Sequence, residues 1–233
     1  MKKLLTILVT VIGFNATAQD NTSHLNVLAV NGLNMRSQPE SKSRVVTKVP
    51  YGKQVEILEK TDNELQLGWV RDNWYKVRFR GREGYIFGGY LSRLNAPVDF
   101  ENPRLLSDLL PMYCSSAFQI DGDPIISKES SRSGDTLFHT LLRFSQDAEL
   151  ELERYGNRKT ATLLLSNSIQ ETYVLLEALL KESGNSQLLE KLRFIKDRNG
   201  MLSRISHADR SVLIKTLSSE RTELSITDQI LSN

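Results

Sequence analysis

The sequence contains little cysteine, little histidine and few long apolar segments. One cysteine and three histidines occur in 233 residues. A single cysteine excludes an intrachain disulfide framework, so the fold must be stabilised by packing. The histidines, His24, His139 and His207, lie far apart, and none has a second ligand at helical or strand spacing. We therefore expect neither a metal site nor a cofactor.

Charge of one sign is not in excess either. The formal net charge is +2, from 30 Lys and Arg against 28 Asp and Glu. Because a nucleic-acid-binding chain usually carries a clear basic excess, we expect no nucleic-acid partner. The two parts of the chain differ, however. Residues 25–94 contain 12 basic and 7 acidic side chains, whereas residues 98–233 contain 16 basic and 20 acidic ones.

The first 18 residues have the parts of an export signal. Lys2 and Lys3 form a positive start, residues 4–14 are an apolar run, and Ala16-Thr17-Ala18 is a small-x-small cleavage site. The apolar run is shorter than the ~20 residues that a membrane-spanning helix needs, and no second run follows. We predict a signal peptide over 1–18, a mature chain exported to the periplasm or the cell exterior, and no transmembrane anchor after signal cleavage.

Residues 25–94 alternate apolar and charged side chains in the manner of half-buried β-strands. The alternation is clear over 54–59 and 75–80. Gly81 can take the positive φ of a tight hairpin turn, and Pro50-Tyr51-Gly52 is a second turn. Short strands with such turns predict a small antiparallel barrel.

The same segment resembles the bacterial SH3-like domain family over about 27–94. The resemblance implies a small all-β barrel that binds a ligand rather than catalyses a reaction. One departure is the stretch 60–73, which is longer than in the shortest members and is interpreted as an extra loop that carries Trp69. The motifs that carry the resemblance, in the order of the family, are Leu33 to Pro39, Val45-Val46, Pro50 to Gly52, Trp74 to Val77, Gly84 to Ile86, and Tyr90-Leu91.

The length of the segment 98–233 predicts a second domain, which we assign to no family. The expected fold class is therefore multi-domain, an N-terminal all-β SH3-like barrel over 25–94 followed by an α+β domain. The Leu-rich helix of this domain could be core or a partner-binding face. The expected elements are a hairpin over 148–153 and 160–165, a helix from the capping box Ser168/Glu171 to Gly184, an undecided segment over 189–197, and strands over 210–217 and 220–227.

The candidate binding residues all belong to the SH3-like segment. Aromatic planes bury much area at low entropy cost, and a guanidinium can bind a carboxylate. Lys76 and Arg78 leave the same face of one strand, which indicates either a basic binding surface or an ordinary solvated face. Trp74, Tyr85 and Tyr90 could instead fill the barrel core. The candidates are Asn34, Arg36, Trp69, Trp74, Lys76, Arg78, Tyr85 and Tyr90.

These features predict a non-catalytic binding module for a cell-envelope ligand, either a peptidoglycan stem peptide or a segment of an envelope protein. A structural protein–protein interaction module is one alternative. Another is an NlpC-type cysteine peptidase acting on peptidoglycan, since Cys114 to Phe118 and Gly134 to Phe138 resemble motifs of that family. The turn residues at 120–124 leave no room for the expected long helix after Cys114, and the histidine strand of the family is missing. We therefore expect no enzymatic activity and a buried Cys114.

Overall fold

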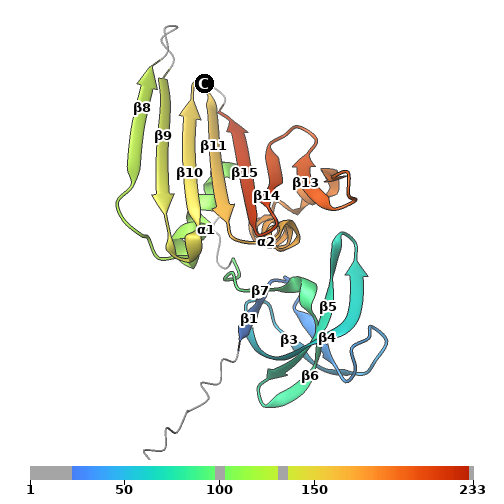
Figure 1. Ribbon diagram of the computed structural model, residues 1–233. Helices are drawn as coiled ribbons and strands as arrows, with labels where there is room; N and C mark the ends of the chain where they lie inside the picture. Colours follow the sequence, from blue (N-terminus) through green and yellow to red (C-terminus); the bar gives the residue numbers. More distant parts are fainter. Residues whose placement is uncertain (1–22, 98–102, 131–135, 231–233) are drawn as a thin grey trace, which may run out of the picture.

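The computed structural model describes residues 23–97, 103–130 and 136–230 and consists of two lobes (Figure 1). The N-terminal lobe (residues 23–97) and the C-terminal lobe (residues 103–230) each contain one antiparallel sheet. None of the described helices combines the length and the apolar character that crossing a bilayer requires. The predicted signal peptide over 1–18 lies outside the described residues.

The N-terminal lobe is a curled sheet of seven strands, in the order β3-β2-β6-β5-β4-β1-β7. It is all-β, as predicted, but β3 and β7 remain its two edges, so the barrel is not closed. The curl encloses a core that includes Met35, Val55, Val77 and Ile86. The elements are β1 (His24–Val27), β2 (Leu33–Arg36), β3 (Val45–Val49), β4 (Gln54–Leu67), β5 (Val70–Phe79), β6 (Arg82–Phe87), the 3₁₀ helix η1 (Gly88–Tyr90) and β7 (Leu91–Ser92).

Glycine residues permit a tight turn and a close approach of two strands in this sheet. The β5–β6 turn consists of Arg80 and Gly81, both with positive φ (50° and 72°), as a tight two-residue hairpin requires. In β6 the backbone of Gly84 lies so close to the paired strand β2 that a Cβ atom would lie 2.7 Å from the carbonyl oxygen of Arg36. Any larger residue at position 84 would therefore push these strands apart.

The stretch 60–73 is not a loop, which corrects the sequence-based interpretation. β4 continues through it to Leu67, and β5 begins at Val70, so that Gly68 and Trp69 form the two-residue turn of a long hairpin. The register shifts between Lys60 and Glu64, and this irregularity hides the strand periodicity in the sequence. The hairpin extends toward the C-terminal lobe and places Trp69 at its tip (Figure 1).

The C-terminal lobe contains a sheet of eight strands, in the order β12-β13-β14-β15-β11-β10-β9-β8, and two α-helices (Figure 1). Its elements are η2 (Leu106–Asp108), α1 (Leu109–Ala117), β8 (Ile125–Ser130), β9 (Thr136–Arg143), η3 (Ser145–Asp147), β10 (Glu149–Tyr155), β11 (Arg158–Leu165), α2 (Ile169–Glu182), η4 (Ser186–Lys191), β12 (Leu192–Lys196), β13 (Leu202–His207), β14 (Val212–Ser218) and β15 (Arg221–Gln229).

This lobe is a β-rich sheet with two helices and is not clearly the α+β domain that the sequence predicts. The hairpin of β10 and β11, helix α2, and strands β14 and β15 were anticipated. Strands β8, β9 and β13 were not, and the undecided segment 189–197 is a 3₁₀ turn followed by β12. β9 (Thr136–Arg143) shows why, since its sequence TLFHTLLR does not alternate and no residue in it is fully buried.

One face of the large sheet forms the core of the C-terminal lobe with α1 and α2. A row of buried residues crosses the sheet in register, from β13 to β10: Ile205, Ile214, Leu224, Leu163 and Leu150. Buried leucines of α2 pack in the same cluster, so the Leu-rich helix is largely core. The predicted N-cap is present, because the Ser168 hydroxyl accepts the N–H of Glu171 at 3.2 Å.

Candidate functional site

The three candidate aromatics at 74, 85 and 90 lie where the N-terminal lobe meets α2. Trp74 is only 4% exposed and packs edge-on against Phe87, so its ring offers no surface to a ligand. Tyr85 and Tyr90 are half-buried and pack against the same apolar cluster. Burial raises the pKa of Tyr90 to about 12, with the charge of Glu177 adding to the effect. These aromatics therefore serve mainly to join the lobes.

The candidate basic groups on β5 are paired with carboxylates. The ammonium of Lys76 lies 3.3 Å from the carboxylate of Glu83, and the guanidinium of Arg78 lies 2.9 Å from those of both Glu56 and Glu83. The hydrogen bonds from Arg78 and Lys76 lower the pKa of Glu83. Because Glu56 and Glu83 balance these cations, this face of β5 resembles an ordinary solvated strand face.

The two candidates on β2 have different environments. The Arg36 guanidinium donates to the carbonyl oxygen of Ser43 at 2.7 Å and so supports the loop between β2 and β3. Asn34 is exposed and stands opposite Lys48 of β3. Neither residue lines the cleft described below.

Trp69 connects the tip of the long hairpin to the C-terminal lobe. Its indole stacks on Phe194 of β12, with ring centroids 4.5 Å apart and an interplanar angle of 6°. Tyr173 of α2 meets the same phenyl ring edge-on at 5.3 Å. The indole is still 45% exposed. Packing between the lobes thus accounts for a residue that had no explanation within the SH3-like segment.

Two polar contacts hold the first turn of α2 against the N-terminal lobe. The backbone N–H of Arg71 donates to the side-chain carbonyl of Gln170 at 2.7 Å. The Ser92 hydroxyl donates to the carboxylate of Glu171. The sequence predicted Glu171 as half of a capping box, but its carboxylate reaches across to the other lobe. These contacts hold the lobes together beside a cleft.

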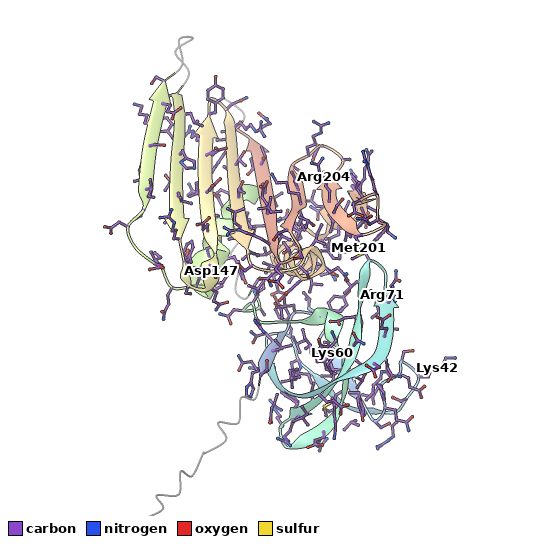
Figure 2. All side chains as sticks on the ribbon, in the orientation of Figure 1. Lys42, Lys60, Arg71, Asp147, Met201 and Arg204 are labelled. Atoms are coloured by element: carbon purple, nitrogen blue, oxygen red, sulfur yellow. The ribbon has the colours of Figure 1, made fainter. Side chains whose placement is uncertain are left out.

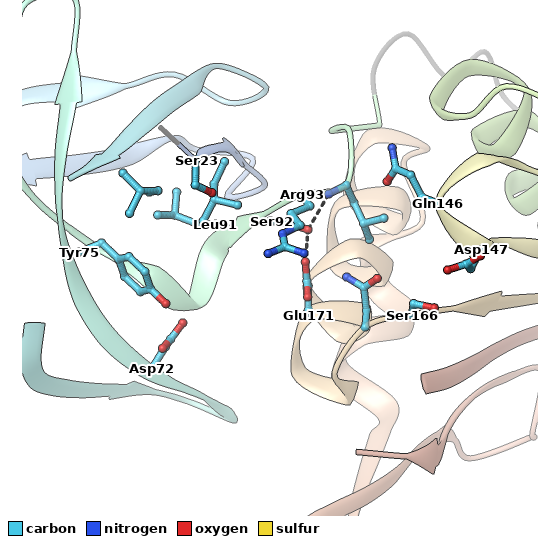
Figure 3. A pocket seen from close by; sticks show the side chains of 14 residues that line it. Ser23, Asp72, Tyr75, Leu91, Ser92, Arg93, Gln146, Asp147, Ser166 and Glu171 are labelled. Atoms are coloured by element: carbon cyan, nitrogen blue, oxygen red, sulfur yellow. Dashed lines mark hydrogen bonds between the residues drawn. The ribbon is translucent and has the colours of Figure 1, made fainter. Parts of the chain in front are cut away.

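The cleft has a volume of about 780 Å³ and lies between the lobes (Figure 3). Tyr75 and Asp72 stand on its N-terminal side, Glu171 and Ser166 on its C-terminal side, and the segment after β7 joins the two walls. The lining residues are Ser23, Leu25, Ile57, Asp72 and Tyr75 from the N-terminal lobe, Leu91, Ser92, Arg93 and Leu94 from the connecting segment, and Gln146, Asp147, Ser166, Asn167 and Glu171 from the C-terminal lobe.

The cleft carries charges of both signs over a partly apolar floor. Asp72 accepts the N–H of Asn73 at 2.7 Å and lies 3.8 Å from the ammonium of Lys60. Burial, followed by the charge of Asp72, raises the pKa of the Tyr75 phenol. Asp147 and Arg93, in contrast, are exposed and have no hydrogen-bond or ion-pair partner among the described residues. The arrangement can therefore offer a cation and an anion to one ligand.

A second groove of about 630 Å³ continues past Arg93 along the start of α2. It shares Arg93, Ser166, Asn167 and Glu171 with the cleft and extends to the turn between β14 and β15. A ligand longer than the cleft could follow this groove without leaving the protein surface.

Sequence reasoning did not find the cleft, because its residues come from segments far apart in the chain. Arg93 lies two residues after the Tyr90-Leu91 motif, and the pattern around Glu171 predicts only the start of a helix. Nothing in the local sequence brings Asp72, Asp147 and Ser166 to one place. Only the packing of α2 against both lobes does so.

Cys114 lies in the middle of α1 and is fully buried, as expected. Burial raises the pKa of its thiol to about 12. The helix ends three residues later, at Ala117. His139 lies on β9, and the Nδ1 atom of His207 forms a hydrogen bond of 2.5 Å with a carboxylate oxygen of Asp209. An ionised thiolate, the form that a cysteine nucleophile needs, is thus disfavoured at this position.

Comparison with protein families agrees with the motifs in the N-terminal lobe. The family model of the bacterial SH3 domain matches residues 31–92, which run from just before β2 to the end of β7. No curated protein matches the chain. Bacterial SH3 domains are commonly cell-wall binding modules and are typical of extracellular proteins. Residues 31–92 are therefore a bacterial SH3 domain, as their sequence motifs predicted.

Proposed function

We propose that this protein is an exported, non-catalytic binding protein of the cell envelope, and that it holds a peptide of the cell wall in the cleft between its two lobes. The observation that carries the proposal is the cleft itself, with its volume of about 780 Å³ and its mixed polar and apolar lining. Ligand sites of small molecules and short peptides typically occupy roughly 300–1,000 Å³.

The SH3 domain supplies one wall of this cleft and links the proposal to the cell wall. Bacterial SH3 domains commonly bind cell-wall components. In this chain Tyr75 and Asp72 of the domain face the cleft (Figure 3), whereas Trp74 is buried. A peptidoglycan stem peptide, or an extended segment of an envelope protein, would place its polar groups against Ser166 and Asn167.

The environment of Cys114 supports a role without catalysis. A cysteine peptidase needs a thiolate beside a base at an accessible site. Cys114 is inaccessible, and burial holds its pKa near 12. The charged and polar residues that line the cleft instead suit recognition.

The proposal is tested by co-sedimentation of the chain from Gln19 onward with purified insoluble peptidoglycan at two salt concentrations. A Ser166→Trp variant places a large side chain in the cleft and should abolish sedimentation. The matched control is Ser41→Trp, because Ser41 is exposed on the loop between β2 and β3 and does not line the cleft. Absence of wild-type sedimentation at both salt concentrations, or equal binding by both variants, would contradict the proposal.

A further inference from the structure

We infer that the cleft selects its ligand by two opposite charges, with Arg93 binding a free carboxylate and Asp147 a free ammonium group. The ligand class is then a short peptide that carries both groups rather than a neutral glycan. This inference rests on the proposed function and specifies the chemistry of the same cleft.

The first observation is that two opposite charges line one cleft and remain unpaired. On the SH3 domain, the cations Lys76 and Arg78 have carboxylate partners. Arg93 and Asp147 have no partner among the residues that the structure describes. Because they do not neutralise each other, both charges stay available to a ligand.

The neighbours of these two residues are engaged elsewhere, which explains why they are free. Glu171, the acidic residue that shares the cleft and the adjoining groove with Arg93, accepts a hydrogen bond from Ser92. The two arginines near Asp147, Arg143 and Arg221, both pair with Glu149, at 3.5 Å and 3.1 Å.

Both charged residues stand on backbone that the structure holds in place. Ser92, next to Arg93, is buried, and its hydroxyl accepts the N–H of Leu94 at 2.9 Å. Asp147 has a left-handed backbone (φ 56°) between Phe144 and Ala148, which are joined by a 2.8 Å backbone hydrogen bond. A site with a fixed backbone loses less entropy when a ligand binds.

The apolar part of the lining indicates what lies between the two charged groups of the ligand. Leu25, Ile57 and Leu91 form this part, beside the ring of Tyr75. Such a floor suits small apolar side chains such as alanine methyl groups, since burying them releases water without requiring a polar partner. The ligand is therefore expected to carry small apolar side chains beside its charged groups.

The probe that tests this inference is a synthetic tetrapeptide, L-alanyl-γ-D-glutamyl-L-lysyl-D-alanine, measured by calorimetry in three forms. One form is free, one has both amines acetylated, and one has both carboxylates amidated. The variants are Arg93→Gln and Asp147→Asn. The controls, Lys42→Gln and Asp62→Asn, remove the same charges from exposed residues outside the cleft, and Figure 2 shows Lys42 far from Asp147.

Each cleft variant should weaken binding of the free peptide about 10-fold or more, as loss of one charge-assisted hydrogen bond does. Arg93→Gln should not weaken the amidated form further, and Asp147→Asn should not weaken the acetylated form further. The inference is overturned if the capped forms bind the wild type as tightly as the free one, if the cleft variants behave like the controls, or if the wild type does not bind the free tetrapeptide. Wild-type sedimentation with peptidoglycan alongside any of these results would leave the proposed function standing.

Discussion

The two lobes differ in how they remove the apolar face of their sheet from water. Each contains an antiparallel sheet with an apolar face that must be removed from water. The SH3 sheet curls around its own core, so its apolar residues face inward without a helix. The C-terminal sheet stays open, and α1 and α2 cover one of its faces (Figure 1). A curled sheet can therefore enclose a core by itself, whereas an open sheet depends on what packs on it.

Helix α2 packs against both lobes. Leu175 is buried in the core of the large sheet, whereas the adjacent Val174 is buried against Leu28, Val70 and Phe87 of the N-terminal lobe. The first turn of α2 also accepts the polar contacts from the SH3 domain. The cleft exists beside this helix because one element is packed on two sides.

The largest effect is expected from Leu175→Ala. Truncation of a buried leucine leaves a cavity and should lower the free energy of unfolding by about 2–5 kcal/mol. The chain contains one cysteine, Cys114 in the C-terminal lobe, and two tryptophans, both in the N-terminal lobe. The denaturant midpoint reported by thiol labelling of Cys114 should therefore shift more than the midpoint reported by tryptophan fluorescence. Equal shifts would show that the lobes unfold as one unit.

Val174→Ala is the matched substitution on the other side of the same helix. It removes less apolar volume, so we expect a loss of about 1–3 kcal/mol. Because Val174 packs with Trp74 and Phe87, the unfolding midpoint reported by tryptophan fluorescence should shift more than the midpoint reported by Cys114 labelling. The reversed order of the two probes between Val174→Ala and Leu175→Ala is the result that supports a two-sided helix. The same order in both variants would contradict it.

Alkaline pH should weaken the C-terminal lobe first. Burial raises the pKa of Cys114 from 9.0 to about 12, and that of Tyr90 in the N-terminal lobe from 10.0 to about 12. The unfolded chain loses these protons at lower pH than the folded chain does. The free energy of unfolding should thus be unaffected by these groups below about pH 9 and should fall as pH rises toward 12.

This pH dependence is measured by denaturant titration between pH 8 and pH 11. Cys114→Ala should show a shallower decline than the wild type, with the difference beginning near pH 9. An identical decline in both proteins would mean that the thiol environment does not contribute.

The smallest effect on stability is expected from Trp69→Ala. Stacked aromatic pairs contribute about 0.5–1.5 kcal/mol beyond the area that they bury, and the indole of Trp69 is half-exposed. The substitution should leave each lobe folded but move the unfolding transitions of the two lobes apart, as Trp74 fluorescence and Cys114 labelling can measure. Trp69→Phe keeps a stacked ring and is the control. If Trp69→Ala leaves the transitions as close together as the control does, the stack does not couple the lobes.

Local signals explain which parts of the fold could be predicted. The β5–β6 turn has Gly81 where a positive φ is needed, and α2 has Ser168 at its N-cap. The turn and the start of the helix can therefore each be predicted from a few adjacent residues. Strand β15 has the polar residue Thr222 at one of the alternating positions that face the core. In the structure Thr222 is buried and its hydroxyl lies 2.6 Å from that of Thr172, which supplies the hydrogen bond that burial of a polar group requires.

The sequence by itself determined the SH3 domain, the β10–β11 hairpin and the Leu-rich helix α2, because periodicity, turn residues and caps act between neighbours in the chain. Only the tertiary structure decided that the stretch 60–73 is a hairpin whose Trp69 stacks on Phe194, and that Arg93 and Asp147 share one cleft. The hairpin is hidden by the register shift between Lys60 and Glu64, whereas the stack and the shared cleft bring together residues about 50 to 125 positions apart, which local physical preferences do not encode.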